Sequence, residues 1–490
     1  MDNLNQKIGR SIKWSTFTEV MNKLVAPITN MVLARLLTPD AFGVVATITM
    51  IISFAEIFSD AGFNRYIIQH EYKDDSDQTI TLNTAFWTNL SISLLIWGAI
   101  SLFSEQLAVL VGNPGLGLAI IVACVAIPLQ AFSSIQMSLY KRNFDFKTLF
   151  GVRAVGLVVP LVVTIPLAYF YRSFWALIIG TVVTNILNAV ILTYFSSWKP
   201  RLSYSFKALR EMFSYSIWVL LDTILVWLTN YFDIFIIGLL LSQYYLGLYK
   251  TAMNVSGQII ALITASLMPV LFSTLSRLQN DLPEFKRTLL KFQKVVSILL
   301  VPLGFGIFAY SDFVTRILLG KQWDEASGFI GWWGLTSCLT ITLSYFCSHT
   351  YPTLGKPRLS VVSQLLHLSF LLPTIYIAAH YSFQTLYLSR SLIRFQGILV
   401  NMIIVYFFIK ITPLTFLKNI FPALISSAIV LSFALLFEKY FFTEYFYLRN
   451  MISIVLSLVL YILLITLFKQ EKQYLVSLTK KAGLHFHKSH

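Results

Sequence analysis

Charged side chains within long apolar stretches are the residues of this chain best suited to do chemistry. An ionisable group inside a membrane is costly, so its presence there predicts a functional site. The basic residues placed in this way are Lys23, Arg153, Lys250, Arg390 and Arg394. Arg390 and Arg394 are four residues apart, hence on one helix face, and Arg suits bidentate contact with phosphate. These cations predict a site for an anionic substrate, and the alternative for each is a helix-end cation that reaches the membrane interface.

Acidic residues within the same stretches suggest coupling of the protein's activity to an ion. Glu56 and Asp60 are one helical turn apart on one face. If both are buried, their mutual repulsion favours retention of a proton on one of them. We predict Glu56, Asp60 and Asp222 as candidates for coupling to H⁺ or Na⁺. The alternative for Asp60 is a solvated position at a helix end.

For two further acidic residues, Glu19 and Asp233, a structural role is an alternative to a role in transport. Glu19 and Lys23 have the i, i+4 spacing of an ion pair within one helix. Asp233, near Asn230, is predicted to contact sugar hydroxyls or a cation, and a polar contact between helices is an equal alternative.

The elements that must position these residues are helices long enough to cross a membrane. Hydrophobic residues make up 57% of the chain and charged residues 12%, against roughly 45–50% and 25% in soluble domains. A helix of about 20 apolar residues crosses a hydrocarbon core of about 30 Å. We therefore predict an all-α integral membrane protein with fourteen transmembrane helices. They lie near 13–37, 41–63, 82–104, 115–139, 149–170, 174–195, 213–241, 246–272, 289–310, 327–351, 359–379, 386–409, 415–437 and 448–468.

The distribution of basic residues fits this topology. With the N-terminus in the cytoplasm, 26 of the 37 Lys and Arg residues lie in inside segments and six in outside segments. That asymmetry follows the positive-inside rule and accounts for the net charge of +15 without a nucleic-acid partner. Both termini are predicted to be cytoplasmic. The N-terminal segment has no small-residue cleavage site, so we do not expect a cleaved signal peptide.

An internal repeat relates the first predicted helix to the seventh. At an offset of 204 residues, Trp14 aligns with Trp218, Leu36-Leu37 with Leu240-Leu241, Gly43 with Gly247, Thr47 with Thr251, and Thr38 with Ser242. This repeat predicts two parallel six-helix lobes, as in transporters that rock two bundles about a central site. The predicted segments are a cytoplasmic N-terminus (1–12), an N-lobe (13–195), a cytoplasmic linker (196–212), a C-lobe (213–409), two added helices (410–468) and a cytoplasmic tail (469–490).

Several segments resemble, in order, one family of transporters. They are LLTPDAFGVVATITMIISFAEIFSDAGF (36–63), TAFWTNL (84–90), RNFDFKTL (142–149), DIFIIGLLLSQYYLGLYKTAMNV (233–255), FSTLSRLQND (272–281) and LGKQWDEA (319–326). Over about residues 5–410 the chain is similar to Wzx-type polysaccharide transporters, a branch of the multidrug/oligosaccharidyl-lipid/polysaccharide flippase superfamily that is related to MATE exporters. The resemblance implies two six-helix lobes around a V-shaped cavity. It also implies movement of undecaprenyl-diphosphate-linked oligosaccharide units across the bacterial inner membrane, for O-antigen, capsule or exopolysaccharide assembly. Arg153, Arg390 and Arg394 depart from the family pattern and are where this member's specificity is expected.

The sequence therefore predicts a transporter and not an enzyme. A diphosphate-linked sugar must be shielded from hydrocarbon, which calls for a wet, cationic groove between the lobes and for alternating access. The expected ligands are the lipid-linked oligosaccharide and membrane lipids, with a polysaccharide polymerase and a chain-length regulator as candidate partners. The alternatives are a drug or cation exporter on the same fold and a polytopic membrane glycosyltransferase or polymerase.

Two patterns that suggest metal or nucleotide chemistry have simpler explanations. Asp75-Ser76-Asp77 has the Asp-x-Asp form of glycosyltransferases, but it directly precedes a predicted helix, where acidic residues complement the helix dipole. Cys124, Cys338 and Cys347 have no metal-ligand spacing and are predicted to be packing residues. No cofactor or metal is expected.

Overall fold

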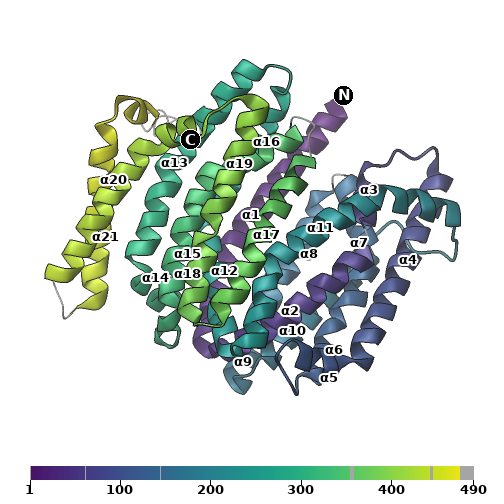
Figure 1. The fold of residues 1–490 in the computed structure, drawn as a ribbon. Helices are drawn as coiled ribbons and strands as arrows, with labels where there is room; N and C mark the ends of the chain where they lie inside the picture. The colour runs from purple at the N-terminus through teal and green to yellow at the C-terminus, as the bar shows by residue number, and fades with distance from the viewer. Residues whose placement is uncertain (1, 61, 144, 354–357, 442–444, 475–490) are drawn as a thin grey trace, which may run out of the picture. The chain divides into compact units, whose positions relative to one another are not determined.

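Helices account for all of the regular structure in the part of the chain that can be described. The computed structural model describes residues 2–60, 62–143, 145–353, 358–441 and 445–474, and no strand occurs among them (Figure 1). The chain divides into two compact units, residues 1–250 and 251–490. The side chain of Asp222, one of the predicted ion-coupling candidates, lies outside the described residues, and so does the tail beyond residue 474.

The first unit contains the helices from α1 to α11 and the first turns of α12. Its elements are α1 (Asp2–Leu36), α2 (Pro39–Asp60), α3 (Phe63–Gln69), α4 (Asp75–Leu102), α5 (Ser104–Leu110), α6 (Gly117–Cys124), α7 (Ala126–Arg142), α8 (Phe146–Val159), η1 (Pro160–Thr164), α9 (Ile165–Tyr171), α10 (Trp175–Phe195), α11 (Phe206–Leu240) and the start of α12 (Gln243–Arg277).

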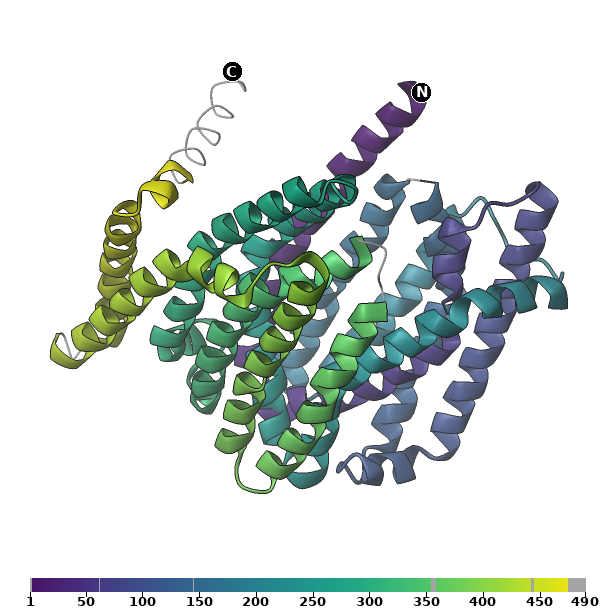
Figure 2. The same cartoon turned by 45° about the horizontal axis from the view of Figure 1, so that its top comes forward.

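The second unit continues α12 and ends with a helical hairpin. Its other elements are α13 (Leu282–Ala309), α14 (Ser311–Leu318), η2 (Lys321–Ala326), α15 (Ser327–Thr340), η3 (Ile341–Tyr345), α16 (Phe346–Thr353), α17 (Arg358–Ala379), α18 (Phe383–Leu392), α19 (Arg394–Ile409), α20 (Pro413–Tyr440) and α21 (Phe446–Thr466). Within this unit α20 and α21 run side by side, and α20 also packs against α13 (Figures 1 and 2).

The protein is a multi-pass membrane protein. Within the described residues, eleven helical stretches are long and apolar enough to cross a membrane. The predicted spans at 13–37, 246–272 and 327–351 are not among these eleven. The total of fourteen helices, their grouping into two lobes and the segment boundaries stay predictions.

Helix bounds support the register of the predicted repeat. The helices α1 and α11 are each 35 residues long. They end at Leu36 and Leu240, and the next helices begin at Pro39 and Gln243, so both ends and both starts keep the offset of 204. A short helix also follows the third long helix of each half, α5 after α4 and α14 after α13.

Helix capping explains the Asp-x-Asp pattern before α4. Asp74 is the N-cap of α4, and its side chain accepts a hydrogen bond from the Asp77 amide at 2.7 Å. The Asp77 carboxylate in turn accepts from the Lys73 amide at 3.2 Å. The first contact satisfies an amide group that the first turn of a helix leaves unpaired, and the second ties the residue before the cap to the helix; together they confirm the capping interpretation.

The cysteines are packing residues, as predicted. All three are buried and free, and Cys124 lies in an apolar cluster with Ile120 and Ile127. Among the described residues, no group of His, Cys, Asp and Glu is arranged to hold a metal ion.

Candidate functional site

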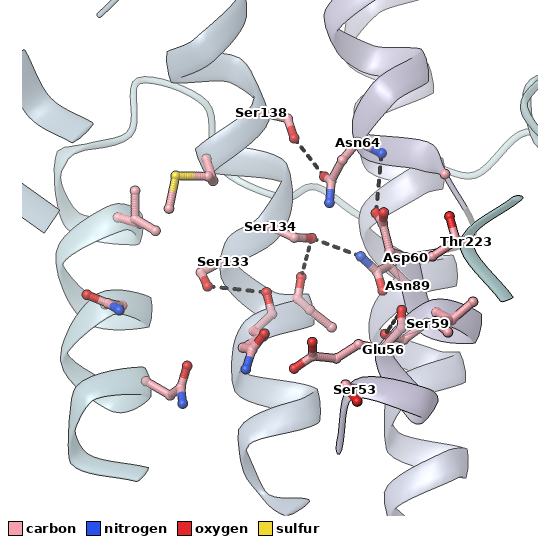
Figure 3. Close-up of a pocket in the computed structure, with 18 of the residues that line it drawn as sticks. Ser53, Glu56, Ser59, Asp60, Asn64, Asn89, Ser133, Ser134, Ser138 and Thr223 are labelled. Atoms are coloured by element: carbon pink, nitrogen blue, oxygen red, sulfur yellow. Dashed lines mark hydrogen bonds between the residues drawn. The ribbon is translucent and has the colours of Figure 1, made fainter. Parts of the chain in front are cut away.

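A polar pocket of about 650 Å³ lies in the first unit among α2, α3, α4, α7, α10 and α11 (Figure 3). Its polar lining residues are Ser53, Glu56, Ser59, Asp60, Asn64, Asn89, Gln130, Ser133, Ser134, Ser138, Lys141, Asn185, Asn188 and Thr223. A pocket of this composition is unusual among membrane-spanning helices, because each polar group needs a partner that lipid cannot provide. The pocket is therefore the strongest candidate for a substrate site in this unit.

Helical periodicity gathers these polar groups on inward faces. On α7, Gln130, Ser134 and Ser138 follow one another at intervals of four residues and line the pocket together. On α10, Asn185 and Asn188 are three residues apart and also line it. Residues three and four apart share a helix face, so each helix contributes a polar stripe to one wall.

Two carboxyl groups enter the pocket from α2. Glu56 faces Gln130 of α7, and the carboxylate of Asp60 accepts a hydrogen bond from the backbone amide of Asn64 at 3.4 Å. Both side chains line the same space (Figure 3). The sequence-based prediction that they share a face is thus supported, and Asp60 is the last residue of α2. Lys141 is the one basic side chain among the described lining residues.

Amide and hydroxyl groups line much of the rest of the pocket. Ser138 Oγ donates to Asn64 Oδ1 at 2.7 Å, and Asn89 Nδ2 donates to Ser134 Oγ at 2.8 Å. Within the described structure, Asn89 Oδ1 and Asn188 Oδ1 are buried oxygen atoms with no hydrogen-bond partner. Buried polar atoms are nearly always paired, so these two acceptors point to a bound polar ligand or water. This lining suits a ligand that is rich in hydroxyl donors.

The basic candidates of the first unit lie against other side chains. Lys23 Nζ is 4.0 Å from Glu19 Oε2, and Arg153 Nη1 is 3.6 Å from Glu19 Oε1. The predicted pair of Glu19 with Lys23 is therefore present, and Arg153 of α8 joins it. Nearly half of the Arg153 side chain is exposed, at 45%.

Asp233 and Lys250 occupy the hairpin formed by α11 and α12. Asp233 is buried, and its carboxylate accepts a hydrogen bond from the Tyr249 hydroxyl at 2.6 Å. This is the polar contact between helices that the sequence allowed as an alternative. The Lys250 ammonium lies 5.1 Å from the centre of the Tyr231 ring, in the range of a cation–π contact.

Arg390 and Arg394 meet on one tryptophan of the second unit. Their guanidinium carbons lie 5.2 Å and 3.5 Å from the centre of the Trp333 ring, and Arg394 also donates to Ser337 Oγ. Arg390 is buried, with only 4% of its surface exposed. The predicted shared face of these two residues is therefore present, although the helix is interrupted between them at Ile393. Two guanidinium groups on one indole make this cluster the most concentrated positive charge among the candidates.

Sequence reasoning missed most of the polar pocket. Among the described lining residues, the predictions include Glu56 and Asp60 but none of the amides, and none of the basic candidates lines this pocket. The signal that was available is the spacing of Gln130, Ser134 and Ser138 on one face of an otherwise apolar helix.

Comparisons with known proteins identify relatives named for polysaccharide biosynthesis. A family model described as polysaccharide biosynthesis protein matches residues 32–328. The succinoglycan biosynthesis transport protein ExoT of Rhizobium meliloti is 24% identical over 341 residues, which are 69% of this chain and 68% of that protein. The lipopolysaccharide biosynthesis protein WzxC of Escherichia coli is 22% identical over 324 residues, which are 66% of this chain and 65% of that protein. The matched part of the chain thus spans about two thirds of the length of these relatives.

Solved structures with a similar fold are transporters too. The lipid II flippase MurJ in an inward closed conformation aligns with a TM-score of 0.75 at 14% identity, covering 94% of this chain and 99% of that one. An inward-facing multidrug resistance transporter of the MATE family and MOP superfamily aligns with a TM-score of 0.62 at 11% identity, covering 80% and 94%. At these identities the comparison shows a shared fold.

Proposed function

We propose, from the premise that this chain belongs to the polysaccharide biosynthesis protein family, that it is a flippase for lipid-linked sugars. The substrate class is an oligosaccharide repeat unit on undecaprenyl diphosphate, moved from the cytoplasmic to the periplasmic leaflet of a bacterial inner membrane. The product serves the assembly of O-antigen, capsule or exopolysaccharide. Two relatives, one named as a succinoglycan biosynthesis transport protein and one as a lipopolysaccharide biosynthesis protein, support this class.

The single observation that carries the proposal is the polar pocket within membrane-spanning helices. A repeat unit presents many hydroxyl groups and no surface that lipid can solvate, so it needs acceptors inside the membrane. The pocket offers two carboxyl groups, several amides and the unpaired oxygen atoms of Asn89 and Asn188. We assign it to the sugar part of the substrate.

The diphosphate needs a different environment, which the arginine pair provides. Arg390 and Arg394 form the cluster on Trp333, and guanidinium groups bind phosphate oxygens through paired, charge-assisted hydrogen bonds. We assign the diphosphate to this cluster, with Lys23, Arg153, Asp233 and Lys250 as further candidates for the substrate path. The prenyl chain stays in the bilayer.

The proposed mechanism is alternating access between two six-helix lobes. The repeat register supports two equivalent halves that begin at α1 and α11, and parallel repeats of this kind rock about a central site. In this arrangement fourteen helices cross the membrane, both termini lie in the cytoplasm, and the chain catalyses no covalent step. Glu56, Asp60 and Asp222 are the candidates for coupling the cycle to H⁺ or Na⁺.

A reconstitution assay tests the proposal directly. Purified protein in liposomes is given a fluorescent sugar on a prenyl diphosphate, and a membrane-impermeant quencher reports which leaflet holds the label. We expect faster exchange between leaflets than in empty liposomes or for a prenyl phosphate without sugar. In cells, deletion should leave lipid-linked repeat units on the cytoplasmic leaflet. Exchange at the rate of empty liposomes refutes the proposal.

One observation favours a second candidate, an exporter of organic cations. Glu56 and Asp60 place two carboxyl groups in the pocket, against the single basic residue Lys141, and carboxylates attract cationic substrates. An exporter should lower the accumulation of a fluorescent cationic dye in cells and leave the lipid-linked sugar in place. Dye efflux without sugar movement would decide for this candidate.

A further inference from the structure

The segment between α10 and α11 (residues 196–205) is fastened along the first half of α4 (Figure 1). The Arg201 amide donates to Asn83 Oδ1 at 3.0 Å, and the Arg201 carbonyl accepts from Trp87 Nε1 at 2.9 Å. Asn83 Nδ2 also donates to Ser203 Oγ at 2.7 Å. The backbone of Arg201 is therefore held on both sides, and the position from which its side chain projects is fixed.

A second polar pocket, of about 610 Å³, lies between this segment, the start of α4 and the end of α7, and we call it the linker pocket. Its polar lining includes Asp75 and Gln78 of α4, Asn143 after α7, and Lys199 and Arg201 of the linker. None of the described residues that line it also lines the pocket assigned to the sugar. Its wall carries both signs of charge, so a different class of ligand is expected here.

Asp75 and Arg201 are the charged side chains that the surrounding contacts leave available to a ligand. Capping of α4 uses the carboxylates of Asp74 and Asp77. The Lys199 ammonium donates to carbonyl groups at the end of α10. Within the described residues, the Asp75 carboxylate and the Arg201 guanidinium make no hydrogen bond or ion pair, and both residues are exposed. An anion and a cation that line one open space suit a ligand that carries both charges.

The length of α4 places the linker pocket at the depth of the lipid head groups. This helix has 28 residues, which at 1.5 Å per residue is about 42 Å, against about 30 Å for the hydrocarbon core. Its acidic residues are in the first turn, so the excess length of about 12 Å, or about eight residues, falls at this end. Asp75 and Gln78 belong to this part of the helix, which the predicted topology assigns to the cytoplasmic leaflet.

Apolar side chains that neighbour the linker pocket in the sequence are strongly exposed. Phe195, the last residue of α10, is 65% exposed, and Leu202 and Phe206 are 92% and 79% exposed. Aromatic residues of membrane proteins gather at the membrane–water interface, where a ring meets both lipid chains and head groups. A ligand bound here thus meets polar groups in the pocket and apolar groups beside it. A membrane lipid matches both, whereas a water-soluble zwitterion uses only the polar part.

We propose that the linker pocket binds the phosphoethanolamine head group of a membrane phospholipid. The Arg201 guanidinium binds the phosphate through charge-assisted hydrogen bonds, and the Asp75 carboxylate accepts hydrogen bonds from the primary ammonium. A choline head group has no N–H group for Asp75, and a glycerol head group carries no cation. The site is separate from the proposed transport of lipid-linked sugars, because the lipid that it holds is part of the membrane and is not carried.

The test compares the binding of three phospholipids with identical acyl chains to delipidated protein in detergent, measured by native mass spectrometry. Phosphatidylethanolamine should bind about fivefold more tightly than phosphatidylcholine or phosphatidylglycerol, since an exposed charge pair contributes up to about 1 kcal/mol. The preference isolates the contact of the ammonium with Asp75, because all three lipids bring a phosphate.

Two variants separate the two halves of the head group. Arg201→Ala should weaken the binding of all three lipids by about fivefold. It keeps both backbone hydrogen bonds of Arg201, so the linker stays in place. Asp75→Asn should weaken phosphatidylethanolamine alone and so abolish its preference. Matched controls are Arg210→Ala and Glu71→Gln, which change exposed residues of the same charges outside the lining of the linker pocket.

The outcomes distinguish this site from other lipid contacts and from the transport function. Equal affinities of the unchanged protein for the three lipids overturn the proposal. So does a preference for phosphatidylethanolamine that Arg201→Ala and Asp75→Asn leave as it is in the controls. Glycerophosphoethanolamine, the head group without acyl chains, should bind weakly; binding as tight as that of the lipid would assign the pocket to a soluble ligand. If the preference holds in a protein that moves no lipid-linked sugar, the site stands and the proposed function fails.

Discussion

Replacing Arg394 with alanine should slow the flipping of lipid-linked sugars by about 10- to 100-fold. Arg394 lies 3.5 Å from the centre of the Trp333 ring and Arg390 lies 5.2 Å from it, so the variant removes the nearer of two guanidinium groups. A hydrogen bond to a charged group contributes about 1.5–3 kcal/mol, and every 1.4 kcal/mol is about tenfold in affinity. Loss of one such contact to the diphosphate gives the stated range.

The assay is leaflet exchange of a fluorescent lipid-linked diphosphate in liposomes, with protein content and thermal stability measured in parallel. Arg394→Lys should give an intermediate rate, because it keeps the charge but loses the planar fork and part of the stacking on Trp333. Arg287→Ala is the matched control. Its side chain is 81% exposed, and its guanidinium lies 3.6 Å from the Glu284 carboxylate; a surface pair of this kind contributes about 0–1 kcal/mol.

Several results would contradict the reasoning. If Arg394→Ala flips the lipid at the normal rate, the arginine cluster does not bind the diphosphate. If the rate and the thermal stability fall together, and Arg394→Lys restores both, the cation–π contact with Trp333 is structural. A slow Arg287→Ala would indicate that overall positive charge matters more than this cluster.

Three further outcomes are expected. Lys250→Ala should reduce surface polysaccharide with normal membrane insertion, while Tyr231→Phe, which keeps the ring beneath the ammonium, should leave export unchanged; both are scored by cell-surface staining. Lys294→Ala should lower the thermal midpoint in detergent, because Lys294 and Glu471 form an ion pair of 3.1 Å with side chains only 13% and 5% exposed, and breaking a buried pair costs about 3–5 kcal/mol; an unchanged midpoint would show that the pair is solvated. Intact protein in membranes should not react with a maleimide at its three buried native cysteines, and rapid labelling would show that these segments open.

Features that depend on local sequence were predictable. The repeat register came from a few identities, and the helix ends at Leu36 and Leu240 keep the predicted offset of 204. Capping before α4 follows from acidic residues at a helix start. The shared face of Arg390 and Arg394 follows from helical periodicity alone. The last two of these inferences need only a few consecutive residues, and the repeat needs only a comparison of two stretches of sequence.

The polar pocket was not predictable because it is made by several helices at once. Asn89, Gln130 and Asn188 lie on three helices that are far apart in the sequence. Single amides in membrane helices are common and usually bond a neighbouring helix, so none of them stands out alone. What distinguishes this group is that its stripes converge and leave Asn89 Oδ1 and Asn188 Oδ1 unpaired. That property exists only after packing.

The two proposed contact regions make different demands on a substrate, and this difference can be measured. Every lipid-linked repeat unit carries the same diphosphate, so Arg394→Ala should slow all of them by a similar factor. Sugars differ in the number and direction of their hydroxyl groups, so a pocket variant should change which sugar is preferred. Asn188→Ala is the best choice, because its buried Oδ1 has no partner in the described structure and its removal breaks no hydrogen bond of that atom. Across a panel of lipid-linked sugars, Asn188→Ala should reorder the rates and Arg394→Ala should preserve their order. The opposite pattern would exchange the two assignments, and an unchanged order in both would remove the pocket from substrate recognition.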